Sequence, residues 1–445
     1  MGKRESNAGL ARLIRETGWT HAQLARHTNS VGTEANTPLR YDESSVTHWL
    51  GGTVPREGAR RCIVEALRRK LNRHVTYAEA GFPPPRHGQS PTAGDVLEGL
   101  IELGRSDMDP SRRGVLGAGL FSVTLTVPGW QDLVGRAEAV EAGKASRIGM
   151  SDVQLVHDLT AKVSDLDYRF GGRHARPVAA AVLVNTVAGY LRADASPEVR
   201  QAMLAAAADL CYLAGYMAVD EGLHGLAQRY YVKSLELAGG SGDRLRYCTT
   251  LRGMSVQAAG LGHGAKSLDL ADAAATPAAD PRLRAFLVGQ QAYAAAMTGD
   301  RTRALRHMGE AEVALERAES PFGATGRYDP AALNDHLSHM RYQLGDFAGS
   351  VEYLTQANHL RSGNQRRSRV HRGAMLAELQ LKIGHLEEAC HTWSAALDEW
   401  PMVHSGRADD RMRTMVQLIR PHTKNAHART LYDQARATLP TRLIR

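Results

Sequence analysis

Hydrophobic residues near the start of the chain recur at helical spacing in four short segments. The apolar positions are Leu10, Leu13 and Ile14; Leu24 and Ala25; Val46, Trp49 and Leu50; and Ile63, Val64, Leu67 and Leu71. This spacing places the apolar side chains of each segment on one face of a helix. The pattern therefore predicts a small N-terminal domain of four helices over residues 1–82.

Residues that favour helix ends define the limits of these segments. Thr20 and Asp42 have short polar side chains that cap the second and third helices, and glycines follow the first and third. We expect the second helix to end near His27 and residues 28–41 to form a long polar turn. Pro55 then opens the fourth helix, where its missing N–H is not needed.

The segment from Gly18 to Arg56 resembles the helix-turn-helix domain of the XRE (lambda-repressor and Cro-like) regulators. The matching pieces are the capped helix THAQLARH, the helix ESSVTHWLGG and the Pro-Arg that follows it. In that family the first residues of the second of these helices meet base edges in the major groove, and the start of the first holds a phosphate. The long turn departs from the family pattern, as does His21, since Gln is frequent at that position.

This resemblance implies a set of DNA-contacting residues. The side chains that face the bases are Glu43, Ser44, Ser45, Thr47 and His48. Those that face the phosphate backbone are Thr20, His21 and Gln23, with Gln23 also within reach of a base. The long turn either touches the backbone through Arg40 or is a mobile loop. Arg56 and Arg60 follow as candidates for further phosphate contacts.

The distribution of charge agrees with a nucleic-acid partner. The chain has a formal net charge of +8, and residues 1–82 carry 13 Lys or Arg against 8 Asp or Glu. The basic residues around the fourth helix are Arg56, Arg60, Arg61, Arg68, Arg69, Lys70 and Arg73. Cations of this kind neutralise phosphates without reading sequence. Alone, a basic helix is better explained as a solvated face; beside a recognition helix, it favours double-stranded DNA.

From about residue 151 the chain repeats itself. Glycines at 222, 262, 299, 345 and 384 are each followed at +9 by a variable, mostly larger residue, and at +5 and +12 by small ones; a weaker copy begins at Thr423. After Gly222, for example, these positions are Ala227, Tyr231 and Ser234. Repeats of about 40 residues are typical of stacked helix hairpins, in which glycine permits the turn and small residues permit close packing.

The repeats resemble tetratricopeptide (TPR) repeats, best in LCYLAGYMAVDEGLHGLAQRYYVKSLELA at 210–238. Together with the head, they resemble a large group of actinobacterial regulators and, by domain order alone, the TPR-containing peptide-pheromone receptors of Gram-positive bacteria. The resemblance implies an all-α protein with a helix-turn-helix domain (1–82), a linker with an apolar segment (83–150) and an α-solenoid of TPR-like helix hairpins (151–445). The solenoid would sense a signal, form a homodimer, or do both.

In a TPR-like superhelix the first helix of each hairpin faces the concave side. The register places there the candidate ligand-binding residues Asp209, Tyr212, Tyr216, Arg252, Tyr293, Asp335, His339, Tyr342 and Glu378. Aromatic side chains mixed with charges suit a peptide or a small organic molecule, while a protein partner is the alternative. Tyrosines at such positions also commonly pack between hairpins.

Other candidate chemistry is weak. His336 and His339 have the spacing of two metal ligands on one helix face, but no third ligand is evident. GLGHGAK at 260–266 lacks the strand and spacing of a phosphate loop and fits a repeat turn. We therefore expect no catalytic site, no metal and no cofactor.

The cysteines and the apolar segment bear on cellular location. The four cysteines lie far apart in helical patterns without a CxxC motif, which predicts reduced core thiols. Residues 111–130 resemble a twin-arginine signal, but they are internal and too short and glycine-broken to span a membrane. We expect this segment to pack against the next domain of a cytoplasmic protein that has no membrane partner.

Two functions are consistent with these patterns. The first is a transcription regulator whose head binds an operator as a homodimer and whose array senses a peptide or small molecule. The second is a TPR interaction scaffold that recruits a protein and is tethered to DNA by its head.

Overall fold

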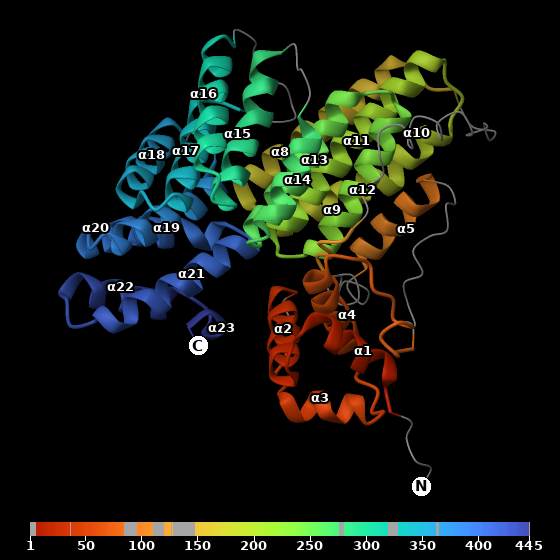
Figure 1. Ribbon diagram of the computed structural model, residues 1–445. Coiled ribbons are helices and arrows are strands. Elements are labelled where there is room, and N and C mark those ends of the chain that lie inside the picture. Colours follow the sequence, from red (N-terminus) through yellow and green to blue (C-terminus); the bar gives the residue numbers. More distant parts are fainter. Residues whose placement is uncertain are drawn as a thin grey trace.

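The computed structural model describes residues 6–35, 37–83, 96–109, 120–125, 127, 147–275, 280–318, 328–361 and 365–444. The regular structure in these ranges is all helical, which confirms the predicted all-α class. The helices form two bodies, a four-helix head and a curved array of helices that lies above it in Figure 1. A short connecting segment, described at residues 120–125 and 127, lies between the two bodies.

The head consists of α1 (Ala8–Thr17), α2 (His21–Glu34), α3 (Glu43–Leu50) and α4 (Glu57–Leu71). Its core contains the apolar positions predicted from the sequence, among them Leu10, Leu24, Val46, Ile63 and Leu67, all fully buried. Three of the predicted helix ends are present, whereas α4 begins at Glu57 after Arg56 as its N-cap, so Pro55 precedes the helix and does not open it. Gly18 closes α1 at φ 67°, and Thr20 and Asp42 cap α2 and α3.

The second helix is longer than predicted, because α2 continues past His27 to Glu34. Thr28 and Val31 are buried on the same face as Leu24, so the apolar stripe runs on through a polar sequence. The turn that follows is held by Asn29, whose side chain donates to the Tyr41 carbonyl at 2.7 Å and accepts from the Tyr41 N–H at 2.9 Å.

The array begins with α5 and α8 to α10 and continues as consecutive helix hairpins. The opening helices are α5 (Val96–Met108), α8 (Met150–Phe170), α9 (Gly172–Val182) and α10 (Ala188–Arg192), the last two joined by a π-helical turn at Leu183–Val187. The hairpins are α11 (Pro197–Asp220) with α12 (His224–Gly240), α13 (Arg244–Gly260) with α14 (Gly264–Ala274), α15 (Pro281–Met297) with α16 (Arg301–Glu316), α17 (Pro330–Gln343) with α18 (Phe347–Leu360), α19 (Arg366–Lys382) with α20 (Leu386–Glu399), and α21 (Gly406–Ile419) with α22 (Ala426–Thr438). Short 3₁₀ turns at Trp400–Met402 and Arg420–His422 flank α21, and α23 (Thr441–Ile444) follows α22.

The predicted repeat register is confirmed by the hairpin turns. The repeat glycines have positive φ in every case: 75° at Gly222, 81° at Gly262, 82° at Gly299, 82° at Gly345 and 93° at Gly384. Glycine adopts this left-handed conformation without the steric cost that a Cβ brings. The small residues five positions later are fully buried, which lets the second helix of each hairpin approach the first: Ala227, Ser267, Ala304, Ser350 and Ala389.

The array starts earlier than predicted, and one of its helices is unusually apolar. Helix α5 packs against α9, α10 and α12, so the array extends to residues before 151. Helix α11 is long and apolar enough to cross a membrane, but 72% of its apolar window is buried inside the array. That burial is typical of a core helix.

The array curves until its late helices meet its early ones. Arg367 on α19 donates to Asp167 on α8 at 2.9 Å and to Asp220 on α11 at 3.2 Å. Arg407 on α21 donates to the same Asp220 carboxylate at 3.2 Å. We call these three ion pairs the closure contacts. Asp167, Arg367 and Arg407 of these contacts line a cavity, and the rest of its wall comes largely from the first helices of the hairpins.

Candidate nucleic-acid interface and ligand cavity

Helix α3 lies at the end of the head farthest from the array (Figure 1). Its inward side is formed by Val46 and Trp49, and the Trp49 ring meets Tyr41 edge-on at 5.0 Å. Its outward side carries the predicted base-facing residues, of which Glu43, Ser44, Thr47 and His48 are exposed and Ser45 is half-buried. The helix is thus fixed on one side and offers a polar face on the other.

The start of α3 is organised around the Asp42 carboxylate. Asp42 Oδ1 accepts the Ser45 N–H at 2.9 Å and the hydroxyls of Ser44 and Ser45 at 2.8 Å each. Hydrogen bonds from the Ser45 N–H and from the two hydroxyls lower the pKa of Asp42 to about 2. Both hydroxyl hydrogens are thus engaged, so the hydroxyl oxygens act as acceptors, and Ser45 Oγ already accepts the Asp42 N–H at 3.4 Å.

The start of α2 forms a reciprocal cap. The Gln23 N–H donates to Thr20 Oγ1 at 3.2 Å, and the Thr20 N–H donates to Gln23 Oε1 at 2.8 Å. His21 is half-buried beside them, and Thr20 is exposed. The remaining N–H groups of this first turn are the part of a helix that binds anions.

The predicted phosphate contacts separate into two groups. Arg40 and Arg56 are exposed. Arg60 is only 8% exposed, and its guanidinium donates to the Pro83 carbonyl. Its position on the inward face of α4 turns it away from solvent, so Arg60 is removed from the candidate DNA contacts.

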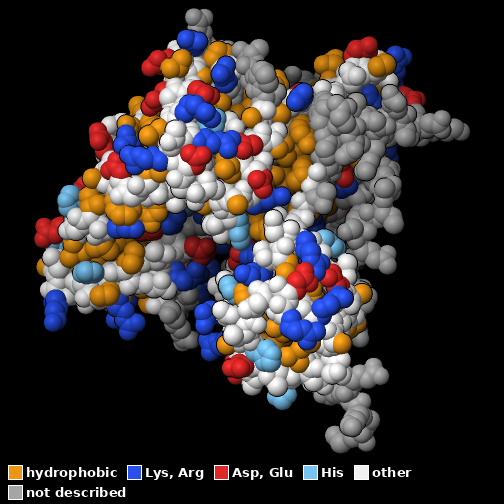
Figure 2. Space-filling model, viewed as in Figure 1, with side chains coloured by type: hydrophobic (Ala, Val, Ile, Leu, Met, Phe, Trp, Pro, Cys, Tyr) orange, Lys and Arg blue, Asp and Glu red, His pale blue; other side chains and the backbone are white. Residues whose placement is uncertain are grey.

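Other arginines in and after α4 are engaged within the head. Arg69 binds both oxygens of Glu34 at 2.7 Å, and Arg73 binds Glu16 at 2.8 Å. These pairs hold helices together. They reduce the number of free cations that the sequence suggested, although Figure 2 shows Lys and Arg side chains on the exposed surface of the head.

Seven of the nine predicted ligand-binding residues line one cavity of about 250 Å³ in the array. They are Asp209, Tyr212, Tyr216, Arg252, Tyr293, Asp335 and His339. The lining comes from α8, α11, α13, α15, α17, α19 and α21, that is, largely from the first helix of each hairpin. The predicted register therefore brings these seven residues together around one cavity.

The other two predicted residues do not line this cavity. Tyr342 is 39% exposed and lies against Lys382 and Phe347. Glu378 accepts a hydrogen bond from Arg411 at 2.7 Å. Both lie toward the C-terminal ends of their helices, beyond the cavity, and they are removed from the candidate ligand site.

The sequence reasoning missed most of the cationic lining. Arg361, Arg367, Arg372 and Arg407 all reach the cavity, together with His336 and His371. The run RRSRVHR at 366–372 was the available signal, because it concentrates basic residues in a short segment and its positions 367 and 371 share one helix face. These arginines act on a lining phenol: although burial favours its neutral form, Arg367 and Arg407 lower the pKa of Tyr216 to about 8.

Two of the three cavity histidines, His336 and His339, act as neutral acceptors. His339 Nδ1 lies 2.7 Å from the Asp335 carbonyl, so it carries the proton, and Nε2 accepts from Arg372 at 3.1 Å. His336 Nε2 accepts from Arg252 at 3.2 Å, and its Nδ1 lies 2.9 Å from the Tyr328 hydroxyl. Burial lowers the pKa of both imidazoles. No group of three or more His, Cys, Asp or Glu in the described ranges is arranged to hold a metal ion.

The connecting segment joins the head to the array. Phe121 is 3% exposed and stacks on His263, which belongs to the turn between α13 and α14. The Ser122 N–H donates to Gln228 of the array at 2.9 Å, and the Val123 N–H donates to Glu65 of the head at 3.2 Å. Part of the predicted apolar segment (111–130) therefore packs as expected; its residues 111–119, 126 and 128–130 lie outside the described ranges.

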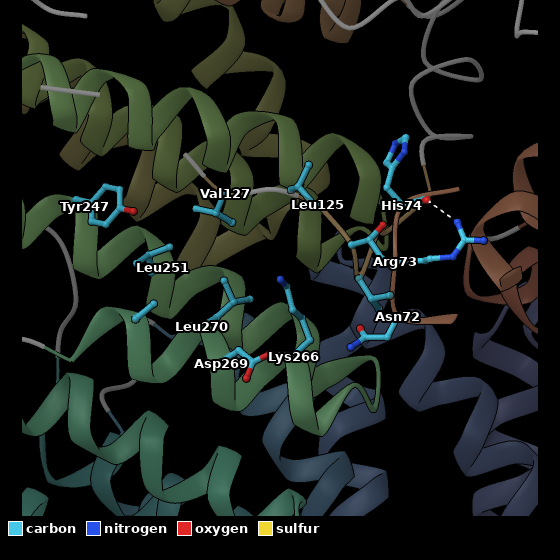
Figure 3. Close-up of a pocket in the computed structure, with 13 residues that line it drawn as sticks. Asn72, Arg73, His74, Leu125, Val127, Tyr247, Leu251, Lys266, Asp269 and Leu270 are labelled. Carbon is cyan, nitrogen blue, oxygen red and sulfur yellow. Dashed lines mark hydrogen bonds between the residues drawn. The ribbon is translucent and has the colours of Figure 1, made fainter. Parts of the chain in front are cut away.

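A pocket of about 510 Å³ lies beside this junction. Figure 3 shows Asn72, Arg73 and His74 of the head on one side and Lys266, Asp269 and other residues of α13 and α14 on the other. Val127 and Leu125 of the connecting segment also reach it. Arg73 is one of the cations that the sequence suggested for phosphate contacts, whereas none of the residues predicted to face bases or to bind a ligand lines this pocket.

One family model matches the chain. Residues 10–83 are similar to the SP15 N-terminal domain, a match that spans α1 to α4 of the head. No curated protein is similar to the chain in sequence.

Proposed function

We propose that this protein is a sequence-specific DNA-binding transcription regulator with an XRE-like helix-turn-helix head and a TPR-like sensor array. The observation that carries the proposal is α3, a capped helix with a buried apolar side and an exposed polar side. A helix of this form fits the major groove of a duplex and reads base edges with its first residues.

The geometry of the serines supports a specific mode of readout. The hydroxyls of Ser44 and Ser45 donate hydrogen bonds to Asp42, so their oxygens accept hydrogen bonds from the exocyclic amino groups of adenine or cytosine. Arg56, Arg40 and the first turn of α2 then bind the flanking phosphates. One head offers a small surface, so we expect a homodimer that binds two half-sites.

The size of the array cavity favours a small molecule over an extended peptide. About 250 Å³ is at the small end for a ligand pocket, and the closure contacts bring α19 and α21 against α8 and α11 around it. Aromatic and charged lining residues supply both apolar contact and polar recognition. The proposed signal is therefore a small organic compound.

Helix α13 offers a route from the cavity to the head. Arg252 on α13 lines the cavity, and the turn that follows α13 carries His263, which contacts Phe121 and lies 3.4 Å from Glu34. A ligand that shifts α13 would alter these contacts and the orientation of the head. It changes DNA affinity only if it binds one orientation preferentially.

Selection from a pool of random duplexes tests the DNA-binding proposal. The full chain should enrich duplexes that share a motif, with two copies at a fixed spacing. Absence of any enriched motif would contradict the proposal and would favour the alternative of a TPR-like interaction scaffold. That alternative predicts a stable protein complex in pull-downs with DNA binding unaffected by small molecules.

A further inference from the structure

Arg252 is a cavity cation that no carboxylate neutralises among the residues described. Its Nη2 donates to the neutral His336, its guanidinium lies 3.9 Å from the centre of the Phe286 ring, and its Nε is buried without a hydrogen-bond partner. The residue as a whole is half-buried. A charge held partly away from water without a counter-ion is costly, and a bound anion relieves that cost.

The carboxylates near Arg252 already form ion pairs with other arginines. Asp335 is shared by Arg372 at 2.6 Å and Arg361 at 3.5 Å. Asp220 is likewise shared by Arg367 and Arg407 at 3.2 Å each. Arg367 also binds Asp167, so Asp167 and Asp220 together balance Arg367 and Arg407, whereas Asp335 alone faces two arginines. Around Asp335 and Arg252 positive charge is therefore in excess, and this excess attracts an anion.

The remaining lining carboxylates are also occupied. Asp209 accepts from Arg246 at 2.9 Å, and Asp329 accepts the Ala332 N–H at 2.8 Å as the cap of α17. Asp167 accepts from Arg367 at 2.9 Å. Among the described residues, none of these three carboxylates forms a hydrogen bond or ion pair with the Arg252 guanidinium.

Aromatic rings form the walls next to Arg252. Phe286 meets Tyr328 edge-on at 5.9 Å, Tyr212 lies 5.9 Å from Tyr231, and Tyr293 meets His339 at 5.2 Å. Flat apolar walls favour a flat ligand body, because aromatic pairs gain from stacked and edge-to-face contact. The available volume of about 250 Å³ limits that body to a small ring system.

We propose that the cavity binds a small aromatic carboxylic acid, with the carboxylate on the Arg252 guanidinium and the ring against Phe286 and the neighbouring tyrosines. The forked guanidinium matches the two carboxylate oxygens, a geometry that a neutral amide does not reproduce. The inference deepens the proposed ligand sensing and rests on it for its regulatory meaning.

Calorimetric titration of the full chain without DNA tests this assignment. The probes are benzoate, phenylacetate and indole-3-acetate, each compared with its primary amide. At least one acid should bind, and its amide should bind about tenfold more weakly or worse, since a charge-assisted hydrogen bond is lost. No binding by any acid, or equal binding by acid and amide, would overturn the proposal.

Variants of the arginine provide the second measurement. Arg252→Gln should lower the affinity for the acid about tenfold or more, and Arg252→Lys should retain part of the preference for acid over amide. Arg306→Gln is the matched control, because Arg306 is exposed on α16 and does not line the cavity. Unchanged acid affinity in Arg252→Gln would refute the role of Arg252. If that variant does not fold, the comparison of acid with amide in the natural protein still tests the proposal.

The DNA-free design separates this inference from the regulator proposal. A chain that binds an aromatic acid but enriches no duplex would keep the cavity assignment and lose the regulator function. A chain that enriches a duplex motif but binds no acid would keep the regulator function and lose the cavity assignment.

Discussion

Removal of the Phe121 side chain should loosen the head from the array without unfolding either body. The ring is buried between them, stacked on His263 at 5.2 Å, and the Phe121 carbonyl accepts from Arg69 at 3.0 Å. Full burial of a phenylalanine stabilises by about 1.5–3 kcal/mol, and the stacked pair adds about 0.5–1.5 kcal/mol. Phe121→Ala should therefore weaken docking by about 2–4 kcal/mol.

Hydrogen exchange at the adjacent amides measures this loss directly. The Ser122 and Val123 N–H groups bind Gln228 and Glu65, so they exchange only when the segment opens. A loss of about 2 kcal/mol or more corresponds to exchange that is roughly 30-fold faster. Amides in the cores of the head and the array should keep their protection in Phe121→Ala.

The control is Phe347→Ala, which removes a half-buried phenylalanine that packs on Tyr342 far along the array. It should leave exchange at Ser122 and Val123 unchanged. Unchanged exchange of these two amides in Phe121→Ala would refute the docking role of the ring. Faster exchange throughout both bodies would refute the view that they are separate units joined by this segment.

Two further predictions compare matched pairs. Arg56→Ala should weaken binding to all duplexes and reduce the slope of affinity against salt, because an exposed phosphate contact is lost. Arg60→Gln should instead lower the melting temperature and keep the salt slope, because Arg60 is engaged inside the head. Equal salt slopes for Arg56→Ala and the natural protein would exclude Arg56 from the interface. Gly345→Ala should destabilise the protein by about 1 kcal/mol, since φ is 82° at this turn, while Gly309→Ala within α16 should stabilise it by about 0.5–1 kcal/mol. Denaturant unfolding measures both changes in the free energy of unfolding, and changes of the same sign would contradict the turn assignment.

Features governed by local chemistry were predictable from the sequence. The caps at Thr20 and Asp42 depend on a short polar side chain and the residue three positions later, and both are present as expected. The turn glycines and the small residues after them follow the same logic, because each hairpin repeats one set of local constraints. Seven cavity residues were found through this register alone.

Features governed by contacts between distant segments were not predictable. The extra length of α2 depends on Val31 packing against Cys62 and Ala66 of α4. One partner of Arg367 is Asp167, 200 residues away in the sequence, and nothing local to either residue indicates the pair. The contact of His263 with the connecting segment is of the same kind, since the repeat pattern explains its turn but not what the turn touches.

The most direct test of the central claim is the ratio of affinities for a selected duplex and a scrambled one, measured for the natural protein and for Ser44→Ala combined with Ser45→Ala. Both hydroxyls lie on the exposed start of α3 and bind Asp42, so their loss should remove base contacts and leave phosphate contacts in place. We predict that the ratio falls about tenfold or more while affinity for the scrambled duplex is retained. An equal fall in both affinities, or a ratio near one for the natural protein, would contradict the assignment of α3 as the helix that reads DNA sequence.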